Sequence, residues 1–255
     1  MIDDAAVTPG YVTGLKPARE LPIIWNITKG SLKNKLLILL PGALLLSWLL
    51  PQAIVFVLMA GGCYLSFEGA EKVMEKLGGE KHGKTLEDEI EDPVAFEKAR
   101  TSGAIRTDLI LSAEIMAITL NEVAAETLLT RAGVLAAVGI AITFVVYGAV
   151  ALIVKMDDVG LYLAEKSSSV AQATGRFLLK AMPWLLKALS LIGTVAMLWV
   201  GGQIVVHGAG LHPPEWLGLH EGFTAWLADV AISGTIGLAL GAVIAGVLHV
   251  VKGGH

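Results

Sequence analysis

The chain has 255 residues, of which 55% are hydrophobic and only 16% are charged, and its formal net charge is −4. A soluble domain usually has about 25% charged residues, so this composition argues against a soluble globule. The few basic residues form no surface interleaved with aromatics, which argues against nucleic acid as a partner. Several apolar runs reach the roughly 20 residues that a helix needs to cross a bilayer. We therefore predict an all-α, polytopic helical membrane protein with about six membrane segments, including a short proline-containing hairpin.

Motifs that carry chemistry are scarce in this sequence. Cys63 is the only cysteine, which excludes an intrachain disulfide and a cysteine-rich metal site. No HExxH, GxSxG, Walker or dinucleotide-binding pattern occurs, so we predict that the protein is not an enzyme. The sequence identifies no cofactor.

Residues 1–35 are predicted to form a cytoplasmic or interfacial segment. Residues 1–20 are polar and contain prolines and glycines that favour turns. The apolar residues that follow lead into Lys29, Lys33 and Lys35. This mixture is typical of a segment that lies on an anionic leaflet.

Residues 36–77 are predicted to form a membrane hairpin with a helical extension. The apolar run 36–67 would be about 48 Å long as one helix, which is too long for a single crossing. Trp48 and Pro51 lie near its middle, where they predict a hairpin tip between two short spans, 36–50 and 52–67. The hydrophilic residues 78–102 are predicted to form a cytoplasmic loop with a short helix near residues 94–100.

The segment Gly103 to Glu126 is the main candidate for function, because it carries ionisable residues on an otherwise apolar helix. An ionised side chain in hydrocarbon costs about 2.5–3.5 kcal/mol on insertion scales, so it usually faces a bundle interior or a partner charge. At 100° per residue, five polar residues fall within about 80° of each other, and Glu114 and Asn121 form a second strip. The five are Asp108, Ser112, Thr119, Glu122 and Glu126. The candidate ion or substrate site comprises Asp108, Ser112, Glu114, Thr119, Asn121 and Glu122.

An alternative role for these carboxylates is to pair with basic residues that hold the bundle together. The candidate charge partners lie at helix ends and comprise Arg106, Glu68, Glu71, Lys72, Lys155, Asp157 and Asp158. Asp108 and Glu114 are about 240° apart around a helix, so they could share a ligand only if the helix breaks between them. Ser112 could satisfy a backbone group freed by such a break.

Residues 103–255 are predicted to form a membrane bundle with an amphipathic segment at 155–182. Spans are expected at 133–154, 184–206 and 226–251. The last span has small residues at every fourth position, which favours close helix packing; these are Ser233, Gly237, Gly241 and Ala245. The connection 207–225 contains His207, His212 and His220, whose irregular spacing matches no metal motif.

Lysine and arginine gather in residues 1–35, 68–106 and 155–187, whereas residues 207–225 contain none. Because cytoplasmic loops are rich in these residues, we predict six membrane segments with the N-terminus and the C-terminus both cytoplasmic.

Seven short motifs, spread in order over nearly the whole chain, resemble the YedI-like bacterial inner-membrane proteins. They are Arg19-Glu-Leu-Pro, Lys29-Gly-Ser-Leu, Phe67-Glu-Gly-Ala-Glu-Lys-Val, Gly103-Ala-Ile-Arg-Thr-Asp, Ile110-Leu-Ser-Ala-Glu-Ile, Lys155-Met-Asp-Asp and Leu163-Ala-Glu-Lys-Ser. That family is a domain-of-unknown-function group, so the resemblance implies location and architecture but no activity. Its members begin with an additional segment containing Leu-Leu-Asp-Asp, and the comparison implies that this chain is N-terminally shortened before Asp3.

A second, shorter likeness concerns the stretch from Asp108 to Glu114. Its pattern, Asp108-Leu-Ile-Leu-Ser112-Ala-Glu114, is similar to the acidic intramembrane motifs of TerC-type metal exporters. Those motifs place carboxylates beside a serine on a short helix, and Glu114 stands where they usually have Asp.

Two functions remain open from the sequence. The first is a cation or proton-coupled transporter or channel of the bacterial inner membrane that uses intramembrane carboxylates. The alternative is a non-transporting membrane protein whose polar residues hold the bundle or dock a partner. The expected partners are the lipid bilayer, a cation or small solute, and a second copy of the chain.

Overall fold

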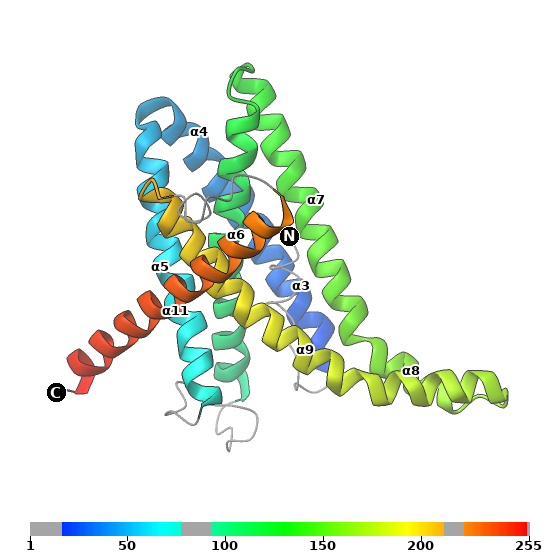
Figure 1. The fold of residues 1–255 in the computed structure, drawn as a ribbon. Coiled ribbons are helices and arrows are strands. Elements are labelled where there is room, and N and C mark those ends of the chain that lie inside the picture. The colour runs from blue at the N-terminus through cyan, green and yellow to red at the C-terminus, as the bar shows by residue number, and fades with distance from the viewer. Residues whose placement is uncertain (1–16, 78–92, 212–221, 254–255) are drawn as a thin grey trace.

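The computed structural model describes residues 17–77, 93–211 and 222–253 (Figure 1). These residues form helices joined by short connections, and this part of the chain has no strand. The helices are α3 (Pro17–Asn34), the π-helix η1 (Lys35–Leu39), α4 (Leu40–Leu49), α5 (Pro51–Lys76), α6 (Pro93–Glu122), α7 (Leu128–Val154), α8 (Met156–Ala164), α9 (Ser169–Gly208) and α11 (Phe223–Gly253).

Five helical stretches among the described residues are long and apolar enough to cross a membrane. They are Arg19–Leu49, Pro51–Lys76, Leu128–Ala164, Ser169–Gly208 and Phe223–His249. Helix α6, with 30 residues, is as long as these stretches but more polar. The prediction of an all-α, multi-pass membrane fold is confirmed.

The first membrane helix is longer than predicted. α3, η1 and α4 follow one another without a break from Pro17 to Leu49, since Asn34 and Leu40 both have helical backbone angles. Ile23, Ile24 and Ile27 are buried in a core cluster with residues of α7. Residues 21–35 were predicted as an interfacial segment, and in the structure their isoleucines form a buried stripe that carries Lys35 into the bundle.

The π-helix has an identifiable cause. Pro41 has no backbone N–H and its ring clashes with the preceding turn, so a helix must adjust just before it. The Leu40 N–H accordingly donates to the carbonyl oxygen of Lys35, five residues earlier. The chain turns at Leu50, which has φ −150° and ψ 72°, and α5 begins at Pro51. The hairpin tip was placed correctly, but the two predicted short spans are parts of much longer helices.

The helices form two groups. α3, η1, α4, α6 and α7 pack around one another, and α5, α9 and α11 form the second and more extensively packed group. Core clusters lie within the first group, around Ile27 and Leu135, and between α5, α6 and α9, around Leu65 and Met197. Contacts between α5 and α6, and the turn from α4 to α5, connect the two groups.

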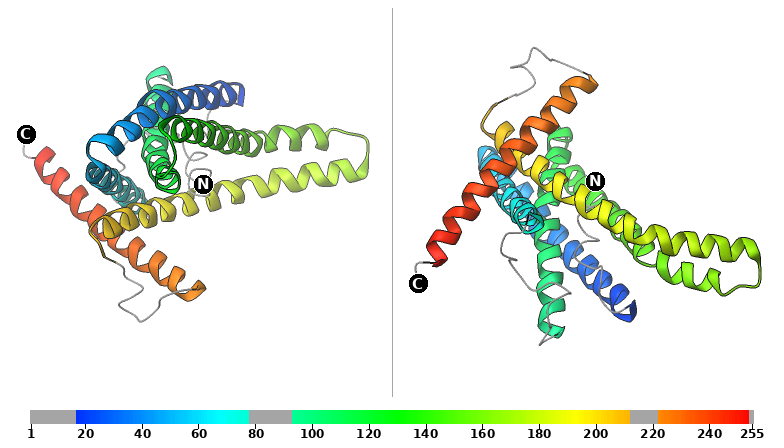
Figure 2. Two further views of the ribbon diagram at one scale, coloured as in Figure 1. Left: turned by 90° about the horizontal axis from the view of Figure 1, so that it is seen from above. Right: turned by 60° about the horizontal axis from the view of Figure 1, so that its bottom comes forward.

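Helix α8 and the start of α9 form an antiparallel arm that projects from the bundle (Figure 2). The two helices meet at Gly160 and Gly175, where a Cβ on Gly175 would touch the Gly160 carbonyl oxygen. α9 continues through Pro183, so the predicted amphipathic segment and the next predicted span are one helix. Its exposed apolar residues on the arm include Val170, Phe177 and Trp184.

Glycines let α11 approach its neighbours closely. A Cβ on Gly237 would overlap the carbonyl oxygen of Leu198 in α9, and one on Gly241 would overlap the carbonyl oxygen of Ser66 in α5. Gly202 of α9 meets the Ser233 carbonyl oxygen in the same way. The predicted small-residue ridge of the last span is therefore confirmed as a helix contact.

We expect the Gly237→Leu/Gly241→Leu double variant to melt at a lower temperature than the wild type in detergent. Each leucine would push a backbone away, and overpacking costs about 1–3 kcal/mol per site. Gly246→Leu on the same helix is the matched control, because a Cβ there meets no atom within 4 Å. Equal melting of the double variant and the control would show that this contact contributes nothing to stability.

Candidate functional site

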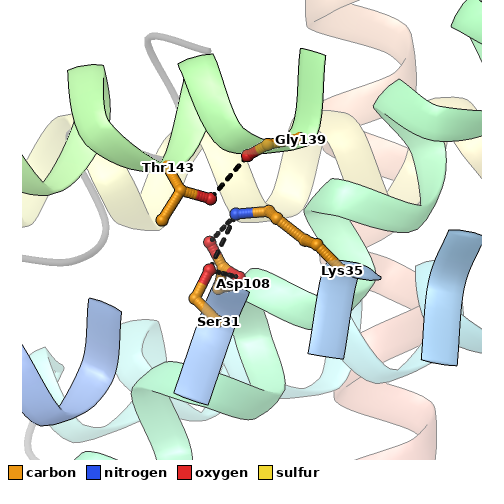
Figure 3. A network of polar contacts seen from close by, with 5 residues as sticks. All are labelled: Ser31, Lys35, Asp108, Gly139 and Thr143. Carbon is orange, nitrogen blue, oxygen red and sulfur yellow. Dashed lines mark hydrogen bonds and ion pairs between the residues drawn. The ribbon is translucent and has the colours of Figure 1, made fainter. Parts of the chain in front are cut away.

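A buried lysine–aspartate pair lies in the first group of helices (Figure 3). Lys35 Nζ lies 3.0 Å from Asp108 Oδ1, and it donates to Ser31 Oγ at 2.8 Å. Ser31 Oγ donates to Asp108 Oδ2 at 2.6 Å. The exposed fractions are 2% for Lys35, 5% for Asp108 and 0% for Ser31. Both charges are thus withdrawn from solvent into a closed hydrogen-bonded triangle.

The sequence places these three groups by helical spacing. Ser31 and Lys35 are four residues apart, so they lie on one face of α3 and η1. Asp108 faces them from α6. Ala104 and Ile105, about one turn earlier on α6, pack in the core cluster that contains Ile23 and Ile27. The apolar contact between the two helices therefore sets the distance at which the charges meet.

Helix α7 closes the site on its third side. Figure 3 shows Thr143 and Gly139 beside the lysine ammonium; Thr143 Oγ1 donates to the Gly139 carbonyl oxygen at 2.7 Å. A Cβ on Gly139 would come within 3.7 Å of Lys35 Cβ and closer still to Met116, so the glycine makes room for the lysine stem. The Tyr147 ring centroid is 5.9 Å from Lys35 Nζ, within the range of a cation–π contact.

The electrostatics of the triangle are those of a neutral, desolvated ion pair. Removing two charges from water costs several kcal/mol per ion, and their attraction offsets this only with good geometry and further hydrogen bonds. Here each carboxylate oxygen accepts one hydrogen bond, and Ser31 bridges the two charged groups. Charge-assisted bonds of this kind are about twice as strong as neutral ones. The two charges therefore balance each other, and removing either one would leave the other uncompensated in a dry site.

Ser112 adds an unused oxygen next to the triangle. It follows Asp108 by one helical turn on the same face of α6 and is 2% exposed. Within the described part of the chain its Oγ has no hydrogen-bond partner. A buried hydroxyl without a partner costs about 1–3 kcal/mol, which makes Ser112 available to a ligand beside Asp108.

The structure separates the other residues of the predicted site. α6 is continuous from Pro93 to Glu122, so the break that would let Asp108 and Glu114 share a ligand does not occur. Glu114 lies half-buried on another face. Thr119 Oγ1 donates to the carbonyl oxygen of Ile115 in its own helix at 2.8 Å. Asn121 and Glu122 are exposed at the end of α6.

The predicted charge partners on α5 and α6 make contacts away from Asp108. Arg106 donates to Tyr64 on α5 at 3.4 Å, and Glu68 accepts from Thr107 at 3.0 Å. Lys72 lies 3.3 Å from Glu68, four residues away on α5, where Glu71 is half-buried. The contacts of Arg106 and Glu68 connect α5 with α6 rather than completing the site.

The remaining predicted partners gather where α7 meets α8. Lys155 forms an ion pair with Asp158, and its Nζ is 3.8 Å from Glu20 on α3. Asp157 accepts a hydrogen bond from the Asp158 backbone. These residues close one end of the first group of helices.

Sequence reasoning missed Lys35 as the partner of Asp108, because the three lysines at 29, 33 and 35 suggested a membrane surface. The spacing of Ser31 and Lys35 behind a stripe of isoleucines was the available signal. It also missed Asp229, a buried acid on α11 that accepts from Gln203 and Ser233 and lies near His207. A single acid inside the apolar run Phe223–His249 was the signal there.

A cavity of about 530 Å³ lies between α3 and α6, on the side of the N-termini of both helices. Polar residues line it, among them Asn26 and Thr101, together with Ile105, three residues before Asp108. At its rim Arg19 donates two hydrogen bonds to Glu97, and this guanidinium lowers the pKa of the Glu97 carboxyl. Among the described residues no group of three or more His, Cys, Asp or Glu gathers as a metal site.

The fold and this buried pair define a multi-pass helical membrane protein with an ionisable pair inside its bundle. The chain belongs to the family described as Protein of unknown function (DUF808), whose profile matches residues 1–247. No curated protein and no solved structure matches it.

We expect Lys35→Met and Asp108→Leu to destabilise the protein singly by about 3–5 kcal/mol each, because each strands the opposite charge. The double variant should be markedly more stable than either single one, since no uncompensated charge remains. The free energy of unfolding of the two single variants and the double variant is measured in detergent. The exposed pair is the control, and Arg19→Gln/Glu97→Gln should barely move the transition. The pairing would be contradicted if the double variant lost as much free energy of unfolding as the two single variants together.

Proposed function

We propose that this chain is a proton-coupled cation transporter whose exchange site is the Lys35–Asp108 pair. The observation that carries the proposal is the burial of both charges inside a multi-pass membrane bundle. Ionisable residues inside a membrane bundle often pair with one another and mark ion pathways and proton relays. On this proposal the protein catalyses no covalent reaction, and its ligands are protons and a small hard cation.

The exchange can be written with charges balanced. The Lys35 ammonium occupies the position beside Asp108 that a cation would need. When the ammonium gives up its proton it becomes a neutral amine, and a monovalent cation can bind the carboxylate in its place. One proton leaves for each cation bound, and the site remains neutral. A divalent cation would leave one uncompensated positive charge in a dry site, so the chemistry favours a monovalent one.

Three features support a cation at this position. Oxygen atoms are the ligands that hard cations prefer. Ser31 Oγ contacts Asp108 and Thr143 lies beside the pair (Figure 3), and Ser112 is one helical turn from Asp108 on α6. The π-helix begins at Lys35, and such segments occur frequently at functional sites. The cavity between α3 and α6 is lined in part by Ile105, which precedes Asp108 by three residues on α6.

A second candidate function is structural. The triangle of Lys35, Asp108 and Ser31 is well satisfied, and it connects α3 with α6 beside α7. A brace of this kind would hold the bundle, or a docking surface on it, with no ion passing. Cation dependence separates this function from transport.

For cation binding, we expect monovalent cations to raise the melting temperature of the wild type, and we expect the effect to strengthen with pH. Because one proton is released per cation, the apparent Kd should fall about tenfold per pH unit while Lys35 is protonated in the free protein. Lys35→Gln should bind without proton release and lose this pH dependence. Asp108→Asn should lose the ion-dependent stabilisation. The melting temperature of each protein is measured with Li⁺, Na⁺, K⁺ and divalent ions between pH 6 and 9.

Glu122→Gln is the matched control for that panel, since Glu122 is an exposed acid on the same helix. It should behave as the wild type. Identical cation responses of the wild type, Lys35→Gln and Asp108→Asn would contradict the exchange site and favour the brace.

In liposomes, we expect the purified protein to couple cation movement to an imposed pH gradient. Asp108→Asn should reduce this flux about a hundredfold, because the cation loses its carboxylate ligand, whereas Glu122→Gln should retain it. A fluorescent pH indicator inside the vesicles measures the coupled proton movement. Transport would be contradicted if, with every cation tested, proton movement in vesicles that contain the wild-type protein equalled that in empty vesicles.

We also propose that the protein is a YedI-like protein of the bacterial inner membrane, with both termini cytoplasmic and with a second copy as a partner. In support, the end of α5 with Lys72 and Lys76, the lysine-containing region 155–187 and the start of α3 lie toward one side of the bundle (Figure 1). The turns at Leu50 and after Glu122 lie toward the other side. In a Cys63→Ala background, a cysteine at Ser168 should be protected from impermeant reagents in intact cells. Labelling of that position from outside the cell would show that the orientation is the opposite of the proposed one.

A further inference from the structure

Helix α9 is too long to lie entirely within a membrane. It has 40 residues, so it is about 60 Å long, roughly twice the thickness of the hydrocarbon core of a bilayer. Even at a tilt of about 40° it would extend about 46 Å along the membrane normal. Its buried residues are concentrated between Gly193 and Val206, and before Gly193 only Gly175 and Met182 are buried. The bundle therefore holds the second half of α9, and the first half leaves the hydrocarbon core.

Helix α8 leaves the bundle in a direction that agrees with this position. The apolar helix α7 ends at Val154, and Lys155 separates it from α8. Figure 1 shows α8 turned sideways from the axis of α7, with the start of α9 alongside it. A helical hairpin that turns aside where an apolar membrane helix ends is placed to lie along the membrane surface.

The exposed side of the arm carries a row of large apolar side chains on α9. Val170, Phe177 and Trp184 are spaced by seven residues, so at 100° per residue they fall within about 40° of one another. Each of the three is at least 68% exposed. The opposite side of α9 faces α8 through Gly175, so the row points away from the arm's own contact.

A basic row runs beside the apolar row. Arg176, Lys180 and Lys187 fall within about 40° of one another and lie about 80° from the apolar row. All three are exposed, and within the described part of the chain none of them forms an ion pair or a hydrogen bond through its side chain. Lys187 Nζ is 5.8 Å from the ring centroid of Trp184, which joins the two rows.

The acids of the arm do not neutralise the basic row. α9 contains no Asp or Glu. On α8, Asp157 and Asp158 lie in the first turn, where Asp158 pairs with Lys155 at the bundle. Glu165 lies at the tip, just after α8. The three cations of α9 therefore need negative charge from outside the protein.

We propose that this face of α9 binds the headgroups of anionic phospholipids. The apolar row enters the boundary between headgroups and acyl chains, and the basic row reaches the phosphates beside it. The long stems of lysine and arginine follow the apolar surface while their charged ends stay at the headgroups. A neutral membrane would satisfy the apolar row alone, so the basic row identifies an anionic leaflet as the occupant. This binding does not depend on cation exchange at Lys35 and Asp108.

The test measures which lipids lie against the arm of the full-length protein. In a Cys63→Ala background, Ala173→Cys carries a bimane fluorophore on an exposed position between the two rows. Phosphatidylcholine nanodiscs contain a small fraction of phosphatidylglycerol or of phosphatidylcholine with a nitroxide quencher near the headgroup. We expect the labelled phosphatidylglycerol to quench about fivefold more strongly, since each cation near an anionic surface contributes roughly that factor.

Removing the basic row should abolish this preference. In the variant Arg176→Gln/Lys180→Gln/Lys187→Gln, the ratio of the two quenching constants should fall to about one. About 0.5 M salt should lower the ratio in the same way when the basic row is intact, because it screens the attraction. The salt measurement needs no substitution in the basic row, so it holds even if the triple variant does not fold.

The matched control removes the same charge from exposed lysines on α3 and α6, and it should keep the original ratio. It is Lys29→Gln/Lys33→Gln/Lys98→Gln. Equal quenching by the two lipids, or quenching by neither, would overturn the proposal. So would quenching that falls when each nanodisc holds two copies of the protein instead of one, because a second copy would then cover the face. None of these readouts requires ion movement, so a failure of the exchange site would leave them unchanged.

Discussion

The ion pair between Lys35 and Asp108 is the interaction on which the first group of helices depends. Its two charges come from segments 73 residues apart in the chain, and the Ser31 hydroxyl and the α7 residues around the ammonium complete its surroundings. In a low-dielectric interior such a pair stabilises little relative to apolar side chains, yet removing one member is costly. This asymmetry makes the pair a sensitive point of the bundle, because a change to one member leaves the charge of the other uncompensated.

The two groups of helices are held together by different kinds of contact. The first brings α3, α6 and α7 together around a charged triangle, whereas α9 and α11 in the second approach through backbone contacts at Gly202 and Gly237. Both groups nevertheless contain a buried acid beside a basic side chain, as with Asp108 and Lys35 in the first and Asp229 and His207 in the second. Polar contacts from Thr107 to Glu68 and from Arg106 to Tyr64 cross between α6 and α5, so the two acids belong to separate but connected units.

The sequence predicted the membrane class, the turn near Pro51, the glycine contacts of the last span and the burial of Asp108. These rest on local properties: apolar run length, a helix breaker, a four-residue spacing and the cost of a charge in hydrocarbon. It did not predict the partner of Asp108, because pairing depends on which helices become neighbours. Lys35 was assigned to a surface on composition, while Ile23 and Ile27 on the same helix decided its burial. Asp229 was overlooked because one acid barely changes the hydropathy of a long apolar run.

Pro41 shows how a local signal can have a consequence elsewhere in the fold. The break predicted in the apolar run 36–67 was at Pro51, and no break was predicted at Pro41. In the structure the helix continues through it, but the preceding turn widens, and the Lys35 carbonyl oxygen accepts from the N–H of Leu40, one residue beyond the donor of an ideal α-helix. A π-turn rotates the residues on either side relative to an ideal helix. Lys35 begins this turn and Ser31 precedes it, so the proline influences the direction in which the ammonium leaves the helix. The geometry at Asp108 therefore depends on a residue that touches neither charge.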